Sequence, residues 1–296
     1  MSAGVATSIR TGEGPTRMLS RWVGGVGWGW LALPGLLLLA ALFLYPFIET
    51  AIKSFVDPSP ANYAIFAESA AYRQSLLTTF RTAFIVSVSC LLLGYPYAYA
   101  MHKLGGRTRA VLGFLVLLPF GTSLLVRTYA WTVWLQDNGI INDALIAVGI
   151  IETPLQMIRT TFAVAVGMTH ALLPFMVFPI YAAMTRVPTD LVPAACSLGA
   201  SRSYAFRRVF LPQTMPGIMA GTLLVFVISL GYYITPALLG SPSNGMLSEL
   251  IVNQVGIQLN FGIGAAIGMV LMVLTIVVLF LGTRLVRFSD LVDWRS

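Results

Sequence analysis

The feature that most constrains this chain is a series of long, uninterrupted apolar runs. A helix needs about 20 such residues to cross roughly 30 Å of hydrocarbon. Runs of this length lie at approximately 28–49, 82–101, 110–134, 162–183, 217–239 and 262–283. A membrane β-barrel would instead show short segments in which apolar and polar residues alternate. The sequence therefore predicts an all-α membrane protein with six transmembrane helices.

Composition supports the same conclusion, because 57% of the 296 residues are hydrophobic and only 10% are charged. Soluble domains carry about 25% charged residues, so lipid must surround much of this chain. Prolines occur inside several runs, including Pro119 and Pro236. A packed membrane bundle tolerates proline because neighbouring groups bond the carbonyls that it leaves free. We therefore interpret these prolines as kinks within the spans.

The positive charges cluster beside the runs, and their distribution indicates the orientation of the chain. The net charge is +7, but no basic stripe with interleaved aromatic residues suggests a nucleic-acid partner. If the N-terminus is inside, most Lys and Arg residues share one side of the membrane, in segments 10–21, 103–109, 186–208 and 284–295. Basic loops remain in the cytoplasm, so both termini are predicted to be cytoplasmic.

The N-terminus has basic residues before the first run, as a signal peptide does. That run is nevertheless long enough to span the membrane, and no small-residue cleavage site follows it. We therefore expect a retained span. The predicted organisation is a cytoplasmic N-terminal tail at 1–27, a first transmembrane helix with a periplasmic loop at 28–75, a five-helix region at 76–284 and a cytoplasmic C-terminal tail at 285–296.

Motifs that mark catalytic chemistry are missing from the sequence. It contains neither the G-x-x-x-x-G-K-[ST] phosphate loop nor the H-E-x-x-H metal motif. Cys90 and Cys196 show no metal-ligand or disulfide spacing. We therefore expect no catalytic, cofactor or metal site in this chain, and no enzymatic activity of its own.

Three ionisable residues are candidates for a translocation path. His170 falls inside the fourth span, where ionisable groups are expensive. A neutral imidazole that bonds a neighbouring helix also explains it. Arg127 falls late in the third span, where it either lines an outer cavity or extends its side chain to the interface. Glu249 precedes the sixth span, near its outer end.

The segment between the fourth and fifth spans, Met184 to Pro216, is longer than a simple connection requires. Thr189 and Asp190 are suited to cap a helix start, with Pro193 in the first turn. Gly199 suits the left-handed position that ends a helix. A short apolar stripe at helical spacing lies between them, formed by Leu191, Ala194, Ala195 and Leu198.

A second short helix is predicted directly after Gly199. Ser201 is suited to cap its start, and Pro212 and Pro216 are expected to stop it. Its basic rim consists of Arg202, Arg207 and Arg208. Two short cytoplasmic helices with an apolar face and a basic rim indicate a docking surface. An amphipathic loop that lies on anionic headgroups is the alternative.

This segment resembles the EAA coupling loop of type I ABC importer permeases, the binding-protein-dependent transport family. The family pattern is E-A-A-x-x-x-G, followed further on by a hydrophobic residue and Leu-Pro. The matching residues are Ala194, Ala195, Gly199, Leu211 and Pro212. Pro193 stands where the family has glutamate, and Asp190, one helical turn earlier, is a candidate substitute for that carboxylate.

The resemblance extends from roughly Trp28 to Arg284. The stretches L-P-F-G-T-S-L-L-V-R-T-Y-A-W (Leu118–Trp131), N-G-I-I-N (Asn138–Asn142) and L-L-P-F-M-V-F-P-I-Y (Leu172–Tyr181) are similar to those of the spermidine/putrescine-type permease subfamily. The resemblance thus implies a pore-forming permease of a bacterial ATP-driven importer, a multi-pass protein of the inner membrane. Its expected cargo is a polyamine or a related small polar solute.

The resemblance also implies an ABC transmembrane type-1 domain at 76–284, with its coupling loop at 184–216. A cytoplasmic ABC ATPase dimer would bind ATP and Mg²⁺ and dock on this loop. A second permease subunit, expected to be a different chain, would complete the pore, and a periplasmic binding protein would deliver the substrate. The residues implied to form the ATPase-coupling loop are Asp190, Ala194, Ala195, Gly199, Ser201, Arg202, Leu211 and Pro212.

An ion-coupled secondary transporter is the main alternative. Such carriers often show inverted repeats and intramembrane acidic residues, and neither is clear in this sequence. A membrane-embedded enzyme would need converging His, Asp or Ser groups, and a channel would need a filter sequence or charged ring. The ABC permease accounts together for the long loop, the topology and the missing phosphate-loop motif.

Overall fold

The computed structural model describes residues 29–57, 59–241 and 245–292. These ranges are largely helical and contain no β-strand. The α-helices are α2 (Gly29–Val56), α3 (Ile65–Glu68), α4 (Ala70–Lys103), α5 (Gly106–Leu117), α6 (Leu124–Leu135), α7 (Ile140–Ala147), α8 (Thr161–Arg186), α9 (Leu191–Ser197), α10 (Arg202–Ala205), α11 (Leu211–Leu230), α12 (Ile234–Leu239), α13 (Leu247–Val252) and α14 (Phe261–Val292). Shorter 3₁₀ or π segments are η1 (Pro60–Ala64), η2 (Leu118–Gly121), η3 (Phe206–Phe210) and η5 (Asn253–Ile257). The predicted all-α class is confirmed, and the predicted tail at 1–27 lies outside the described residues.

Residues 29–50, which make up most of α2, belong to a separate unit from the rest of the described chain. This helix is apolar along its length, with a mean hydropathy of 2.0 in its most apolar window. Pro34 and Pro46 lie inside it without ending it. It coincides with the first predicted span and extends past it to Val56.

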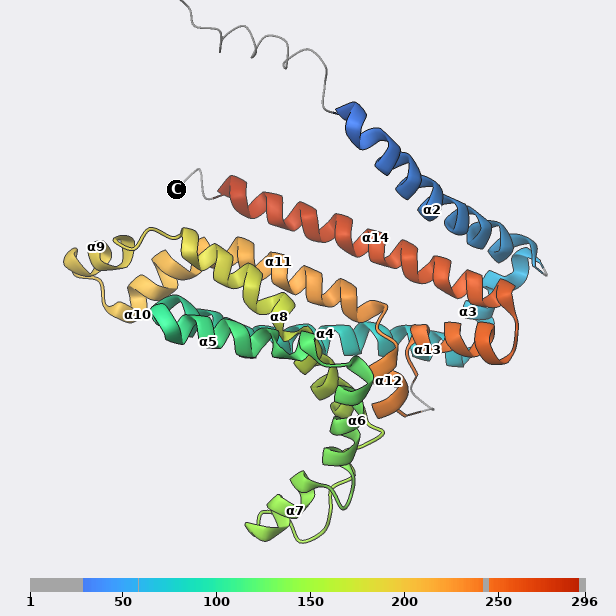
Figure 1. Cartoon of the computed structure of the whole chain (residues 1–296), viewed down its shortest axis with the longest axis horizontal. Coiled ribbons are helices and arrows are strands. Elements are labelled where there is room, and N and C mark those ends of the chain that lie inside the picture. The colour runs from blue at the N-terminus through green and yellow to red at the C-terminus, as the bar shows by residue number, and fades with distance from the viewer. Residues whose placement is uncertain (1–28, 58, 242–244, 293–296) are drawn as a thin grey trace, which may run out of the picture. The chain divides into compact units, whose positions relative to one another are not determined.

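The remaining residues form a second unit whose core consists of α4, α8 and α11 (Figure 1). Glycines allow these helices to approach one another closely. A Cβ atom at Gly94 or at Gly221 would lie 2.9 or 3.0 Å from the side chain of Met176, which therefore sits between α4 and α11. A Cβ atom at Gly217 would lie 2.6 Å from the carbonyl oxygen of Pro179. Small residues at helix contacts are the usual means of close packing in membranes.

The third predicted span, 110–134, is not one helix. Gly106–Gly121 and Leu124–Ala147 are bent by 97° relative to each other, so α6 and α7 project sideways from the bundle (Figure 1). Pro119 lies in the 3₁₀ turn η2 at this break. The Arg127 Nη1 atom donates a hydrogen bond to the Pro119 carbonyl oxygen at 2.7 Å. The Thr122 hydroxyl donates to the same carbonyl at 3.0 Å. Pro119 therefore lies at a 97° break between two helices, whereas the sequence predicted a kink within one continuous helix.

The fifth predicted span, 217–239, is displaced toward the N-terminus. α10, η3 and α11 form one continuous rod from Arg202 to Leu230, and Pro236 lies in the separate helix α12. Pro212 and Pro216 do not stop this helix, contrary to the prediction. The Leu211 N–H bonds the carbonyl of Phe206, one residue further back than in an α-helix. After this π turn, α11 begins as a new α-helical segment, and Pro212 lies in its first turn. The missing N–H of a proline is tolerated at that position.

Five helices in the described part of the chain are long and apolar enough to cross a membrane, and the bent pair makes six if it is counted as one span. The predicted number of spans holds only on that count. α9 and α10 lie at one end of the bundle, called the α9 end below, and α13 lies toward the other (Figure 1). α14 continues into the predicted C-terminal tail as far as Val292.

Candidate coupling and translocation sites

The coupling segment begins with α9, which starts where the sequence predicts. Asp190 occupies the N-cap position, but its side chain makes no capping hydrogen bond. Its carboxylate instead accepts a hydrogen bond from the Thr189 hydroxyl at 3.1 Å. Pro193 falls in the first turn, where a helix needs no N–H donor. The helix start is confirmed, whereas the predicted capping by the Asp190 side chain is wrong.

A left-handed glycine ends α9, as predicted. Gly199 has a φ of +94°. Its N–H donates to the Cys196 carbonyl, and the Ala200 N–H donates to the Ala195 carbonyl, both at 3.0 Å. This pair of bonds is a Schellman motif, which satisfies carbonyls that the helix end would leave free. Other residues pay about 1–2 kcal/mol in this backbone region, so Gly199 sets the direction in which the chain leaves α9.

The apolar stripe of α9 is divided between the bundle and the surface. Leu191 packs against the core of the bundle. Leu198 is 90% exposed and Ala194 is also exposed. α9 lies at one end of the bundle (Figure 1). Ala194 and Leu198 therefore form an apolar edge that no described part of the chain covers. An edge of this kind is available to a partner.

Ser201 caps the second helix, as predicted, because its hydroxyl oxygen accepts a hydrogen bond from the Tyr204 N–H at 3.3 Å. Arg202, Arg207 and Arg208 are all exposed. Leu211 and Pro212 do not end this helix but lie inside the rod that continues into α11. The short coupling helix and a membrane span are therefore one mechanical element.

An aromatic cluster that sequence reasoning missed fixes this rod to α4. Tyr99 contacts Phe206 and Phe210 edge-on, with ring centroids 5.4 and 5.7 Å apart. Tyr95 contacts Phe206 at 6.4 Å. Its hydroxyl also lies within hydrogen-bond distance, 3.4 Å, of the Thr214 hydroxyl. Edge-to-face contacts of this kind add about 0.5–1.5 kcal/mol per pair, so movement of the rod is shared with α4.

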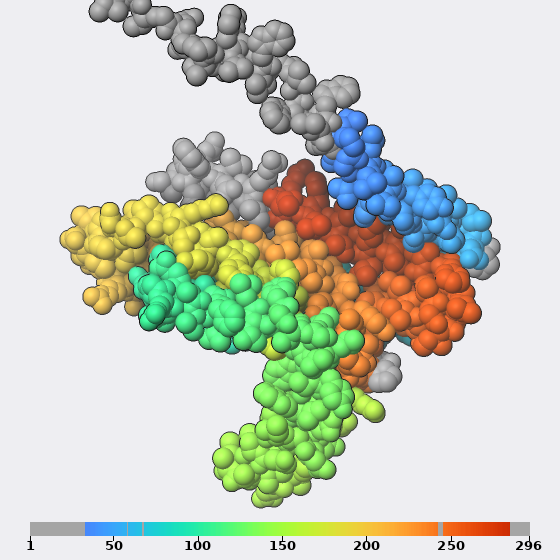
Figure 2. Space-filling model, viewed as in Figure 1, coloured from blue at the N-terminus to red at the C-terminus, as the bar shows by residue number. Residues whose placement is uncertain are grey.

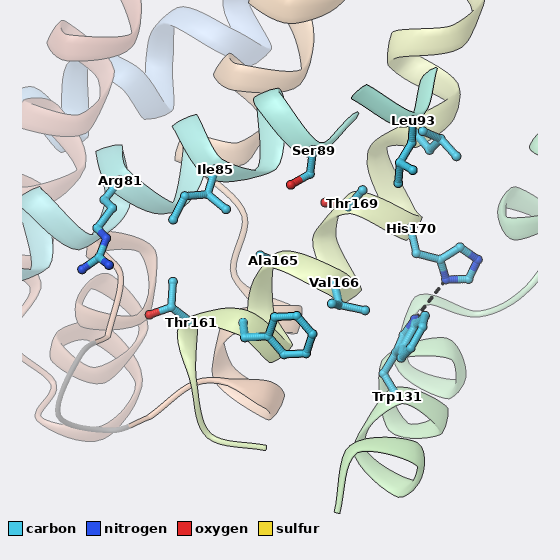
Figure 3. A pocket seen from close by; sticks show the side chains of 12 residues that line it. Arg81, Ile85, Ser89, Leu93, Trp131, Thr161, Ala165, Val166, Thr169 and His170 are labelled. Atoms are coloured by element: carbon cyan, nitrogen blue, oxygen red, sulfur yellow. Dashed lines mark hydrogen bonds between the residues drawn. The ribbon is translucent and has the colours of Figure 1, made fainter. Parts of the chain in front are cut away.

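A cavity of about 640 Å³ opens between α4, α6 and α8 (Figure 3). Its polar or aromatic lining side chains include Arg81, Ser89, Trp131, Thr161, Thr169 and His170. The described lining residues include no carboxylate. The Thr169 hydroxyl is buried and has no hydrogen-bond partner in the described part of the chain. The cavity therefore presents hydroxyl groups and aromatic rings, with a single guanidinium.

His170 joins α8 to α6 at this cavity. The Trp131 indole N–H donates to His170 Nδ1 at 3.1 Å (Figure 3). The interpretation of His170 as an imidazole paired with a neighbouring helix is confirmed. Because Nδ1 accepts this bond, a neutral ring carries its proton on Nε2. That His170 belongs to a translocation path stays a prediction.

Arg127 and Glu249 do not line this cavity. The Arg127 guanidinium donates to the Pro119 carbonyl at the break in the third span; a role for Arg127 at an outer cavity or at the interface stays a prediction. Glu249 lies in α13, where its carboxylate accepts a hydrogen bond from the Met246 N–H at 2.9 Å. Burial raises the pKa of Glu249, and the Met246 bond partly opposes this effect. The three candidate path residues are therefore not brought together in one cavity.

Sequence reasoning missed Arg81, Ser89 and Trp131, which line the same cavity as His170. A signal was present, because Arg81, Ile85, Ser89 and Leu93 follow one another at intervals of one helical turn and all line the cavity. The second span was predicted to begin at 82, however, whereas α4 begins at Ala70. That boundary error left Arg81 outside the helix face to which it belongs.

The fold resembles those of solved ABC importer subunits. One chain of a bacterial alginate ABC transporter matches 92% of this chain and 96% of its own length, with a TM-score of 0.69 and 18% identity. A chain of the MetNI methionine ABC transporter matches 74% of this chain and 96% of its own length, with a TM-score of 0.57 and 20% identity. At this identity the matches show the fold alone, and it is the ABC importer permease fold.

Sequence comparison identifies the family. Residues 91–289 match the family described as binding-protein-dependent transport system inner membrane component, and the chain belongs to it. The spermidine/putrescine transport system permease protein PotB of Haemophilus influenzae is 35% identical over 85% of this chain and 87% of that protein. The PotB protein of Salmonella typhimurium strain LT2 is 34% identical over 90% and 94%. The inner membrane ABC transporter permease protein YdcU of Escherichia coli K12 is 31% identical over 79% and 75%.

The family confirms several expectations of the sequence. This chain is a multi-pass inner-membrane permease subunit of a binding-protein-dependent transport system. The predicted resemblance to type I importers and to the spermidine/putrescine-type subfamily is confirmed. The alternative of an ion-coupled secondary transporter is not supported by either comparison.

Proposed function

We propose that this chain forms one half of the pore of an ATP-driven polyamine importer. A second permease subunit of different sequence forms the other half, and a periplasmic binding protein delivers the substrate. An ABC ATPase dimer binds ATP and Mg²⁺ and docks on the coupling segment 184–216. The names of the PotB relatives support the cargo.

The observation that carries the proposal is the continuous rod from Arg202 to Leu230. An ATPase that engages the exposed edge at Ala194 and Leu198 would move α9 and the rod together, since the Schellman turn at Gly199 joins them. The rod continues into a membrane span without a joint, and its aromatic contacts pass the displacement to α4. Rigid elements are what carry coupling between distant sites.

The α9 end is assigned to the cytoplasm in this proposal. The basic residues at this end support the orientation, because basic loops stay inside. They comprise Lys103, Arg107, Arg109, Arg186, Arg202, Arg207 and Arg208. Among them, Arg202, Arg207 and Arg208 of the coupling segment are exposed and suit docking of an acidic partner surface.

The cavity between α4, α6 and α8 is assigned to the wall of the translocation path. Hydroxyl groups and aromatic rings can contact ammonium groups without holding them tightly, because cation–π contacts contribute about 0.5–2 kcal/mol. Arg81 would repel a polycation at this wall, and no described carboxylate there would retain it. Weak contacts favour release of a ligand that the binding protein has already selected.

Affinity purification of the tagged full-length chain from its native membranes tests the assembly. Recovery of an ABC ATPase together with a second, different permease is expected. Recovery of this chain alone, also after the complex is trapped in its ATP-bound state, would refute the importer. Uptake of labelled spermidine and putrescine by the reconstituted complex tests the cargo. Uptake of an amino acid but of neither polyamine would leave the importer intact and overturn the substrate.

A further inference from the structure

A second cavity, of about 520 Å³, lies at the α9 end of the bundle. It is lined by the end of α4, by α5, by the turn between α8 and α9, and by Phe210. His102, Lys103 and Arg109 contribute basic groups, and Thr185 and Thr189 contribute hydroxyl groups. The described lining residues include no Asp or Glu. We call this cavity the basic groove.

The basic side chains of this groove are positioned but not neutralised by the chain itself. The Arg109 Nε atom donates to the carbonyl oxygens of Met101 and Leu104, at 3.2 Å each, which fixes the guanidinium at the α4–α5 turn. Its Nη atoms form no hydrogen bond within the described part of the chain. The Lys103 ammonium lies 5.6 Å from the centroid of the Tyr99 ring. The groove therefore presents the Lys103 ammonium and the outer nitrogens of Arg109 to an incoming anion.

The nearest acidic residue along the chain, Asp190, does not neutralise the positive charge of the groove. Asp190 follows Thr189 but is exposed and is not part of the groove lining. Its carboxylate accepts the Thr189 hydroxyl. Pro193, which does line the groove, brings no charge.

An exposed apolar helix face adjoins the groove. Arg109 lies in the first turn of α5, and this helix runs along the surface of the bundle from the α9 end (Figure 2). Val111, Phe114 and Leu115 on this helix are exposed, Phe114 by 67%. Because α4 and α8 are long and apolar enough to cross a membrane, this exposed face of α5 is available to lipid acyl chains, and the groove lies beside the ends of these helices.

We propose that the basic groove binds the phosphate headgroup of an anionic phospholipid whose acyl chains lie along α5. Basic pockets between the ends of transmembrane helices commonly recognise such headgroups. A docked acidic protein segment would use the charges but not the apolar face of α5. The groove includes residues of the coupling segment, such as Thr189 and Pro193, but the exposed edge at Ala194 and Leu198 that is expected to meet the ATPase lies outside its lining. The bound lipid braces the base of α9 against α4 and α5.

The matched variants are Lys103→Glu and Arg107→Glu. Both reverse one charge of an exposed side chain at the same end of the bundle, but Lys103 lines the groove and Arg107 does not. The full chain, with the subunits that copurify, is incubated with phosphatidylglycerol or phosphatidylcholine and examined by native mass spectrometry. Wild type and Arg107→Glu should retain phosphatidylglycerol equally, with no retention of phosphatidylcholine. Lys103→Glu should weaken retention at least about ten-fold.

Lys103→Gln guards against a folding defect, because it removes the charge without adding an acid. It should elute as wild type does and show a smaller loss of phosphatidylglycerol. Equal losses in Lys103→Glu and Arg107→Glu would mean general surface attraction and would overturn the site. Displacement of the lipid by millimolar inorganic phosphate alone would show an anion site without lipid specificity. Retention of lipid only when the ATPase is absent would assign the groove to the partner.

Discussion

Replacement of Gly199 by alanine isolates the contribution of one backbone conformation to coupling. No heavy atom lies within 4 Å of a Cβ placed at Gly199, so the added methyl group meets no obstacle. The φ of +94° is nevertheless strained for alanine. The cost is about 1–2 kcal/mol, which corresponds to a factor of about 5–30 in the population of the native turn.

Gly105→Ala is the matched control at the same end of the bundle. A Cβ at Gly105 also meets nothing within 4 Å, but its φ of −97° is ordinary for any residue. Gly105 is the N-cap of α5, so alanine there should cost about 0.5–1 kcal/mol through weaker capping, without the strain of a positive φ. The two variants therefore differ in backbone strain and not in steric contact.

The assay compares substrate uptake with ATP hydrolysis in proteoliposomes that contain the complete importer. Gly199→Ala should lower uptake per ATP by up to about 5–30-fold, while Gly105→Ala should match wild type. The thermal midpoint of the bundle should hardly change, because α9 contributes little to the core. Equal uptake per ATP in the two variants would refute the role of the left-handed turn in coupling.

The remaining predictions concern packing, protonation and the cavity. Gly217→Ala should destabilise the bundle by about 1–3 kcal/mol in thermal denaturation, since overpacking forces α11 away from α8, whereas Gly231→Ala, with nothing within 4 Å, should not. Burial raises the pKa of Glu249, which means that the folded state favours the protonated carboxyl. The contribution of this group to folding stability is therefore complete below the unfolded pKa of about 4.3 and is lost as pH rises through the folded pKa. Glu249→Gln should therefore flatten the pH dependence of the melting temperature in that window, and an unchanged profile would contradict this assignment. Trp131→Phe should lower the free energy of unfolding by about 0.6 kcal/mol, the mean for an interhelical hydrogen bond in a membrane bundle, because His170 loses its donor. If denaturation in detergent shows no such loss, the bond is not formed.

Local signals in the sequence predicted several parts of the candidate sites. Gly199 and Ser201 were identified as helix boundaries, since a positive φ and an N-cap hydroxyl are preferences of single residues. Pro212 was misinterpreted by the same reasoning. Proline normally ends a helix, but the π turn that accommodates it depends on how the chain is bonded around Phe206.

The sequence by itself determined that this protein is an all-α membrane protein, and its motifs indicated the permease family and a candidate coupling segment. Hydropathy over one span and the turn preference of glycine are local quantities, and they need no knowledge of neighbouring helices. The tertiary structure alone decided that the third span bends and that α10 continues into α11. It also decided which residues share a cavity, as with Trp131 and His170, which are 39 residues apart. These outcomes depend on hydrogen bonds that form only in the folded chain, such as the donation by Trp131 to His170 and by Arg127 to the Pro119 carbonyl, and hydropathy does not encode them.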